Sequence, residues 1–162
     1  MSEPPRGYES IKIQKTEHAE ENAKSINVLD EEIKKVIYHA ETSGEKLFIP
    51  GEERFFTKTK IGEKTFYVEY SPVGEGEYRV FNVYAYKPVH KGGKLVGAQT
   101  VNWHCFKCGV PMRAASVNME YRGISGAVEG IMCPKCGETY LLEDVVKAKV
   151  LKAEKLIDAK SR

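Results

Sequence analysis

The sequence lacks several features that would place the protein in a well-defined class. No apolar run approaches the roughly 18 residues that a membrane-spanning helix needs. The first residues show no basic start followed by an apolar stretch, so we expect neither a membrane span nor a secretory signal. There is also no large excess of one charge, because 25 lysines and arginines face 23 acidic residues, for a net charge of +2. A highly basic protein that coats nucleic acid is therefore not expected.

Cysteine is scarce as well, and its distribution is informative. The chain has four cysteines in 162 residues, all in two close pairs. In a cytoplasmic protein, which is the localisation we expect here, thiols stay reduced and close pairs favour metal or redox chemistry over a disulfide framework. No nucleophile–base motif, phosphate-binding glycine loop or paired acidic site stands out.

The expected fold class is α+β. Residues 1–26 are polar and contain few large apolar side chains, which predicts a flexible tail. Residues 27–87 predict one module, in which a helix with an apolar stripe that ends at Gly44 covers a small antiparallel meander. Aromatic and β-branched residues at 55–61, 66–70 and 78–86 give the meander its three strands.

The second half of the chain is organised around cysteine. Residues 88–98 contain Pro88 and the pair Gly92-Gly93, which predicts a linker. Residues 99–162 predict a small four-cysteine metal ribbon, similar to zinc ribbons and rubredoxins, followed by a C-terminal helix with an apolar face.

The two cysteine pairs have matching sequences. They are Cys105-Phe106-Lys107-Cys108-Gly109 and Cys133-Pro134-Lys135-Cys136-Gly137, with 24 residues between Cys108 and Cys133. A two-residue spacer lets both sulfurs of a pair point at one ion, and a glycine after the second cysteine fits a tight knuckle with unusual backbone angles. We therefore expect Cys105, Cys108, Cys133 and Cys136 to bind one metal ion. Two thiol–disulfide pairs are a less favoured alternative, because neither pair is placed at a helix N-terminus.

The identity of the metal stays open between zinc and a single iron. Four thiolates accept either ion in tetrahedral geometry, and the Cys-Pro-x-Cys-Gly knuckle occurs in zinc ribbons and in rubredoxins. Spacing alone favours zinc, and it argues against an iron–sulfur cluster. A closed four-cysteine site leaves no coordination position for a substrate, so a carrier or an accessory protein is expected rather than an enzyme.

Basic residues are concentrated near the first cysteine pair. Residues 87–122 hold six basic side chains and one acidic side chain, for a balance of +5. The simplest interpretation is a solvated face. Two further interpretations are electrostatic docking of an acidic protein and binding of nucleic acid, with Trp103, Phe106 and Tyr121 available for stacking. His104 directly precedes Cys105, but with four cysteines present we expect it to lie outside the ligand set.

Several stretches resemble a known group of proteins. Residues 41–47, 67–70 and 81–86, and the run from Cys105 through Cys136 to the helix after Tyr140, are similar to small proteins of anaerobic bacteria and archaea. These proteins are labelled redox proteins, and some are encoded near molybdenum hydroxylases such as aldehyde oxidoreductases. The resemblance covers roughly residues 29–158. It implies an electron-transfer or accessory role beside a larger oxidoreductase, with the four cysteines as the positions that matter.

Overall fold

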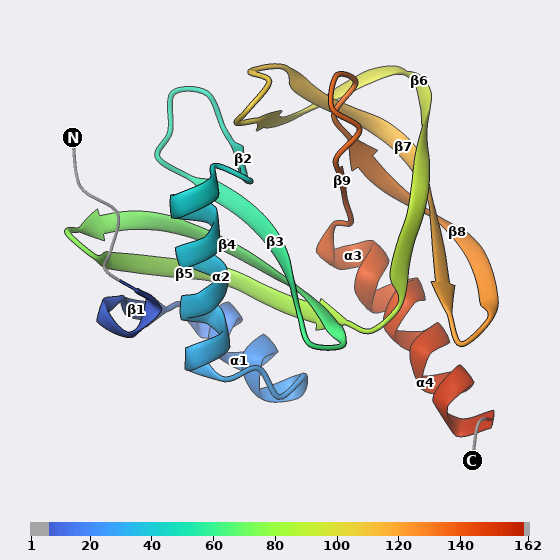
Figure 1. The fold of residues 1–162 in the computed structure, drawn as a ribbon, viewed down its shortest axis with the longest axis horizontal. Coiled ribbons are helices and arrows are strands. Elements are labelled where there is room, and N and C mark those ends of the chain that lie inside the picture. Colours follow the sequence, from blue (N-terminus) through green and yellow to red (C-terminus); the bar gives the residue numbers. More distant parts are fainter. Residues whose placement is uncertain (1–6, 161–162) are drawn as a thin grey trace. The chain divides into compact units, whose positions relative to one another are not determined.

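The computed structural model describes residues 7–160, which form two compact units (Figure 1). The N-terminal unit comprises residues 7–62 and 66–85, and the C-terminal unit comprises residues 63–65 and 86–160. In chain order the elements are η1 (Tyr8–Ser10), β1 (Lys12–Lys15), α1 (Glu17–Ser25), α2 (Asp30–Ser43), β2 (Leu47–Phe48), β3 (Phe55–Ile61), β4 (Lys64–Gly74), β5 (Glu77–Tyr86), β6 (Val89–Cys105), β7 (Pro111–Tyr121), β8 (Ile124–Met132), β9 (Thr139–Tyr140), α3 (Glu143–Val145), the π-helical turn η2 (Val146–Val150) and α4 (Leu151–Lys160).

The predicted fold class, α+β with a small meander and a ribbon, is wrong, because the described chain is mostly β and contains nine strands. The N-terminal strands are ordered β1-β5-β4-β3-β2, and β1 runs parallel to β5. The C-terminal strands are ordered β6-β7-β8-β9, and each neighbouring pair is antiparallel. Strand pairing between segments far apart in sequence outweighed the local pattern from which the α+β class was predicted.

Helix α2 supplies much of the N-terminal core (Figure 1). Ile33, Val36, Ile37 and Ala40 recur at helical spacing, and all four are completely buried. Burial of a valine or isoleucine side chain stabilises the fold by about 1.5–3 kcal/mol. The helix ends at Gly44, whose φ of 75° is the left-handed conformation of a glycine C-cap, as the sequence predicts.

Two segments with little apolar periodicity nevertheless form regular structure. Strand β1 and helix α1 occupy residues 12–25 of the segment expected to be a tail, and Ala19, Asn22 and Ala23 are buried there. Residues 1–6 of that segment lie outside the described residues. Strand β6 covers the whole expected linker from Val89 onward, and it reaches the first cysteine pair.

The C-terminal unit is a curved antiparallel sheet followed by a helical segment (Figure 1). Strands β7 and β8 form a hairpin through Arg122 and Gly123, whose φ values of 51° and 80° are typical of a type I′ turn. The buried side chains of this unit come mainly from β7 and from the stretch that begins just before α3, and they include Met112, Val117, Met119, Leu141, Val146 and Val150. Helix α4 itself buries no residue, so the helical segment packs mainly through its first turns.

None of the helices between residues 7 and 160 has both the length and the apolar character that crossing a membrane requires.

Candidate metal centre

The two cysteine pairs lie in two turns of the same construction. The first turn joins the end of β6 to the start of β7, and the second joins the end of β8 to the start of β9. In the first, the N–H of Gly109 donates to the carbonyl of Cys105 at 2.8 Å; in the second, the N–H of Gly137 donates to the carbonyl of Cys133 at 3.0 Å. We call residues 105–110 and 133–138 the two knuckles.

The closing hydrogen bonds of the knuckles match as well. The N–H of Cys105 donates to the carbonyl of Val110, and the N–H of Cys133 donates to the carbonyl of Glu138, both at 2.9 Å. Gly109 and Gly137 have φ values of 69° and 82°, a region that is costly for a residue with a Cβ. The predicted role of the two glycines is confirmed.

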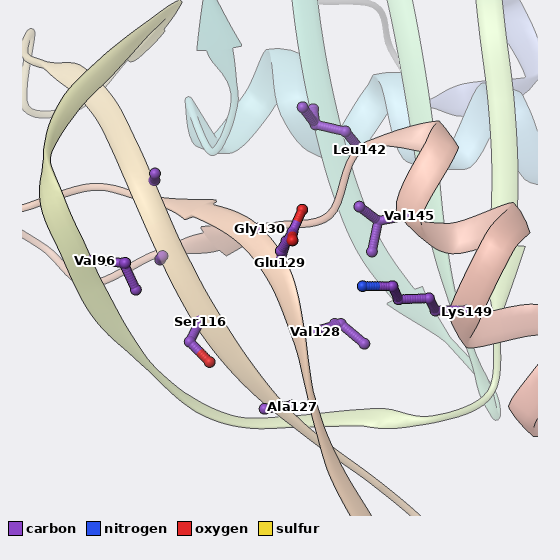
Figure 2. Close-up of a pocket in the computed structure, with 11 residues that line it drawn as sticks. Val96, Ser116, Ala127, Val128, Glu129, Gly130, Leu142, Val145 and Lys149 are labelled. Atoms are coloured by element: carbon purple, nitrogen blue, oxygen red, sulfur yellow. The ribbon is translucent and has the colours of Figure 1, made fainter.

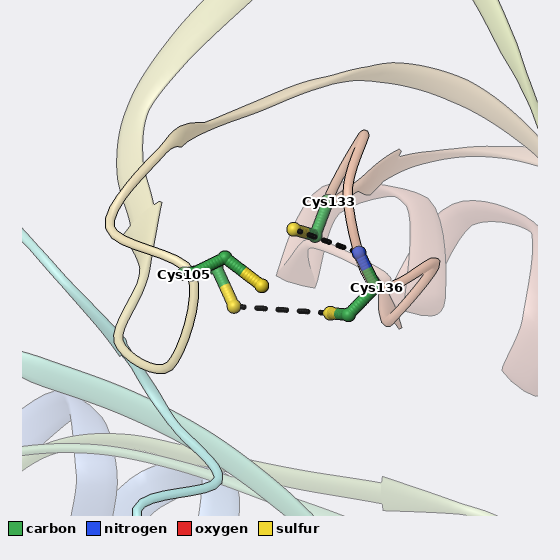
Figure 3. A group of neighbouring side chains, drawn as sticks. Cys105, Cys133 and Cys136 are labelled. Atoms are coloured by element: carbon green, nitrogen blue, oxygen red, sulfur yellow. Dashed lines mark hydrogen bonds between the residues drawn. The ribbon is translucent and has the colours of Figure 1, made fainter.

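The fold brings together all four cysteines that the sequence singled out. The Sγ atoms of Cys105, Cys108, Cys133 and Cys136 all lie within 4.8 Å of one another. The Sγ atoms of Cys105 and Cys136, which come from different knuckles, are 3.9 Å apart (Figure 3). A tetrahedral zinc ion with Zn–S bonds of about 2.3 Å places its sulfurs about 3.8 Å apart, so the four thiols fit one such ion. All four cysteines are free thiols.

The backbone of the second knuckle favours a thiolate. Burial raises the pKa of Cys133, but hydrogen bonds to its sulfur outweigh burial, so its pKa lies below the ordinary value. These hydrogen bonds come from the backbone N–H groups of Cys136 and Lys135 and from the thiols of Cys136 and Cys108. The N–H of Cys136 points at Sγ of Cys133 at 3.5 Å (Figure 3). Burial raises the pKa of the other three thiols. A metal ion binds thiolates, so the cluster would release protons when it binds one.

The centre is buried on one side only. Cys105 and Cys133 begin their knuckles and are 5% and 0% exposed. Cys108 is partly exposed and Cys136 is exposed, and each stands near the tip of its knuckle. The metal-binding cluster therefore lies at the surface of the C-terminal unit, with its outer thiols accessible from solvent.

The histidines lie outside this cluster. His104 places its Nδ1 atom 3.0 Å from the carbonyl oxygen of Asn102, and it does not belong to the cysteine group. His90, to which the sequence gave no role, supports the second knuckle: its Nε2 atom lies 2.5 Å from the hydroxyl of Tyr86, and its Nδ1 atom lies 2.7 Å from Oγ1 of Thr139. Thr139 follows that knuckle directly. No local sequence signal could have revealed a contact across 49 residues.

The basic segment near the first knuckle is less available than its charge suggests. Lys87 and Arg122 both form ion pairs with Asp158, at 3.5 and 3.4 Å. A guanidinium N–H of Arg113 donates to the carbonyl of Gly97. At least three of the six basic side chains are thus engaged within the unit.

The fold and the cluster together define a β-rich protein with a four-cysteine metal-binding module. Residues 101–160 match the family model of a domain of unknown function, DUF7479, which spans both knuckles and the helical segment. No curated protein and no solved structure matches this chain.

Proposed function

We propose that this is a small accessory protein that holds one structural zinc ion through Cys105, Cys108, Cys133 and Cys136 and binds a larger oxidoreductase. The observation that carries the proposal is the cluster of four Sγ atoms within 4.8 Å on two matching knuckles. A zinc ion held by four thiolates has no open coordination position, and it would supply folding free energy rather than chemistry.

The exposed surface of the knuckles supports a role in protein binding. Lys107 and Lys135 occupy the same position in the two knuckles, directly before the second cysteine, and both are exposed. Phe106 is 47% exposed beside them. Two lysines and an aromatic ring around a metal centre suit an acidic partner surface, because complementary charge speeds association and selects partners.

Metal content tests the first part of the proposal. Protein purified without oxygen is expected to contain one zinc per chain and to show no visible absorption. A folded C-terminal unit without bound metal would contradict the proposal, because the thiols would then serve another purpose.

Charge reversal tests the second part. With a purified aldehyde oxidoreductase as the probe, the double substitution Lys107→Glu and Lys135→Glu should lower the amount of bound protein. The matched control is Lys91→Glu with Lys94→Glu, two exposed lysines on β6 outside the knuckles. Equal binding by both double variants would exclude docking through the knuckles.

A second candidate function is electron transfer by a single iron in the same four thiolates. The exposure of Cys136 and the partial exposure of Cys108 favour this candidate, because a redox centre must come close to its partner at the surface. Iron is the ion of this pair that supplies one-electron chemistry. One iron per chain, with thiolate-to-iron absorption bands that bleach on reduction, would support the carrier over the structural zinc.

A further inference from the structure

The second knuckle is anchored by a very short strand. Met132 directly precedes this knuckle and Thr139 directly follows it, and the two residues pair with each other across β8 and β9. Strand β9 has two residues, whereas the first knuckle leads into β7, a strand of 11 residues that pairs with both β6 and β8. A pairing of two residues holds a segment only weakly, so side-chain contacts count for more at the second knuckle.

His90 of β6 makes such a contact at the end of the second knuckle. Its Nδ1 atom lies 2.7 Å from Oγ1 of Thr139, which is buried. On its other side, Nε2 lies 2.5 Å from the hydroxyl of the buried Tyr86, and the two rings are stacked with their centroids 6.0 Å apart. A hydroxyl can donate or accept, so both ring nitrogens have suitable partners in either tautomer of a neutral histidine. The imidazole is therefore held on both sides.

Gly93 brings the same stretch of β6 close to both ends of the knuckle. A Cβ at Gly93 would lie 2.9 Å from Cγ2 of Thr139 and 3.2 Å from Sδ of Met132. Only a residue without a side chain lets the backbone of β6 approach these two residues so closely. This close packing is independent of the hydrogen bond from His90, and it shows that residues 90–93 fit against the base of the second knuckle.

The position of Thr139 affects two of the four thiols. The N–H of Cys133 donates to the carbonyl of Glu138 at 2.9 Å, and Glu138 directly precedes Thr139. A shift of Thr139 would therefore move the base of the knuckle, and with it the sulfurs of Cys133 and Cys136 relative to those of the first knuckle. A tetrahedral zinc ion needs its sulfurs about 3.8 Å apart, so such a shift weakens the bonds between metal and thiolates. Replacement of residues that orient metal ligands typically changes metal affinity about 10–100-fold.

We propose that His90 is a positioning residue of the metal centre. Through Thr139 it holds the second knuckle in the geometry that binds the ion, so its loss speeds metal release although all four thiols remain. The proposal rests on the metal binding proposed above, and it adds a residue that lies outside the ligand set.

The rate of zinc release tests the proposal on the full-length, zinc-loaded protein. An excess of a colorimetric chelator takes up the zinc, and its absorbance gives the rate. His90→Phe keeps a ring but removes both hydrogen bonds, and Thr139→Val keeps the shape but removes the hydroxyl. We expect each substitution to speed release about tenfold or more. An unchanged rate in His90→Phe would overturn the proposal.

The double variant shows whether the two residues act through one contact. His90→Phe and Thr139→Val break the same hydrogen bond, so the double variant should release zinc about as fast as either single variant. If the two effects instead multiply, each residue acts independently, and His90 does not position the knuckle through Thr139.

Two conservative substitutions separate the hydrogen bonds of His90. The amide of an asparagine reaches the position of Nδ1, whereas the amide of a glutamine reaches the position of Nε2. His90→Asn can therefore keep the bond to Thr139, and its release rate should stay within about threefold of the unsubstituted protein. His90→Gln keeps only the bond to Tyr86 and should release zinc as fast as His90→Phe. The reverse order would exclude positioning through Thr139.

A variant elsewhere in the unit controls for general loss of stability. A cavity of about 540 Å³ is lined by residues of β7 and β8 and by Leu142 and Val145 (Figure 2). None of its lining residues belongs to a knuckle or to the contacts of His90. Val145→Ala should lower the urea midpoint and change zinc release by less than about twofold. If it speeds release as much as His90→Phe, the effect of His90 is general instability and the proposal is overturned.

Zinc content separates this proposal from the one on which it rests. If the unsubstituted protein binds no zinc, the proposed metal centre fails, and the role of His90 fails with it. If every variant binds one zinc and all release it at the same rate, the metal centre stands and only the role of His90 is overturned.

Discussion

The hydroxyl of Tyr121 donates a hydrogen bond of 2.6 Å to Oδ1 of Asp158, and so joins the end of β7 to helix α4. Asp158 also forms ion pairs with Lys87 and Arg122. No residue of α4 is fully buried, and these polar contacts help to hold the last turns of the helix.

Removing the Asp158 carboxylate is expected to loosen α4. In Asp158→Asn, amides of residues 151–160 should exchange faster at pH 7, whereas Asp144→Asn, the same change at an exposed residue of α3, should leave them unchanged.

The hydrogen bond from Tyr121, followed by the charges of Lys87 and Arg122, lowers the pKa of Asp158 below 3.8. The stability that the ionised Asp158 carboxylate adds to the folded state is therefore complete above about pH 4, and it is lost as the pH falls through the lowered pKa. A carboxyl titration by NMR checks this, because Tyr121→Phe should raise that pKa; an unchanged value would exclude the hydrogen bond as the main cause.

Loss of one thiol should unfold the C-terminal unit and spare the N-terminal unit. The substitutions Cys108→Ser and Cys136→Ser each remove one of the four thiols of the cluster, and we expect the C-terminal unit, whose two knuckles one metal ion would join, to depend on that ion for stability. The main N-terminal core cluster, from Ile11 to Ala85, contains no cysteine. We expect NMR spectra in which only signals of residues 86–160 collapse. A chelator should reproduce this in the unsubstituted protein, and added metal should reverse it. A C-terminal unit that stays folded without metal would favour the dithiol alternative.

Two glycines of β8 offer a matched test of packing. A Cβ at Gly130 would lie 2.7 Å from Cγ2 of Val117 and 2.9 Å from the carbonyl oxygen of Tyr140, whereas a Cβ at Gly126 would meet nothing within 4 Å. Gly130→Ala should therefore lower the free energy of unfolding by about 1–3 kcal/mol. Gly126→Ala should change it by less than about 0.5 kcal/mol. Urea unfolding of both variants measures the difference. Equal free energies of unfolding would mean that the sheet accommodates the added methyl group at Gly130 without loss of stability.

Tyr78 should ionise late in the N-terminal unit. Burial, together with the negative charge and the hydrogen bond of Glu41, raises its pKa to about 12. The folded state thus favours the protonated tyrosine. The stability that this preference adds to the folded state is complete below pH 10, and it is lost as the pH rises toward 12. The difference between ultraviolet titrations of the unsubstituted protein and Tyr78→Phe isolates this group. Glu41→Gln should lower the pKa, and a difference curve centred near 10 would contradict the burial of Tyr78.

The amino-acid sequence by itself specifies the features that depend on a few neighbouring residues. Each knuckle spans six residues, and its cysteines and a glycine with positive φ determine its conformation. A glycine with positive φ also ends α2, at Gly44. The distance between the two knuckles along the chain then suggests that their thiols meet, and the structure brings them within 4.8 Å.

Only the tertiary structure decided how much of the chain is β. Strand β1 has four residues with weak alternation, and it becomes a strand because it pairs in parallel with β5, whose partner residues lie 65 positions away. Strand β6 contains glycines that predict a linker, yet pairing with β7 makes it a strand. Hydrogen bonds between strands join residues far apart in sequence, so local propensity does not reveal them. For the same reason, the contact of His90 with Thr139, which supports the second knuckle, became visible only once the chain was folded.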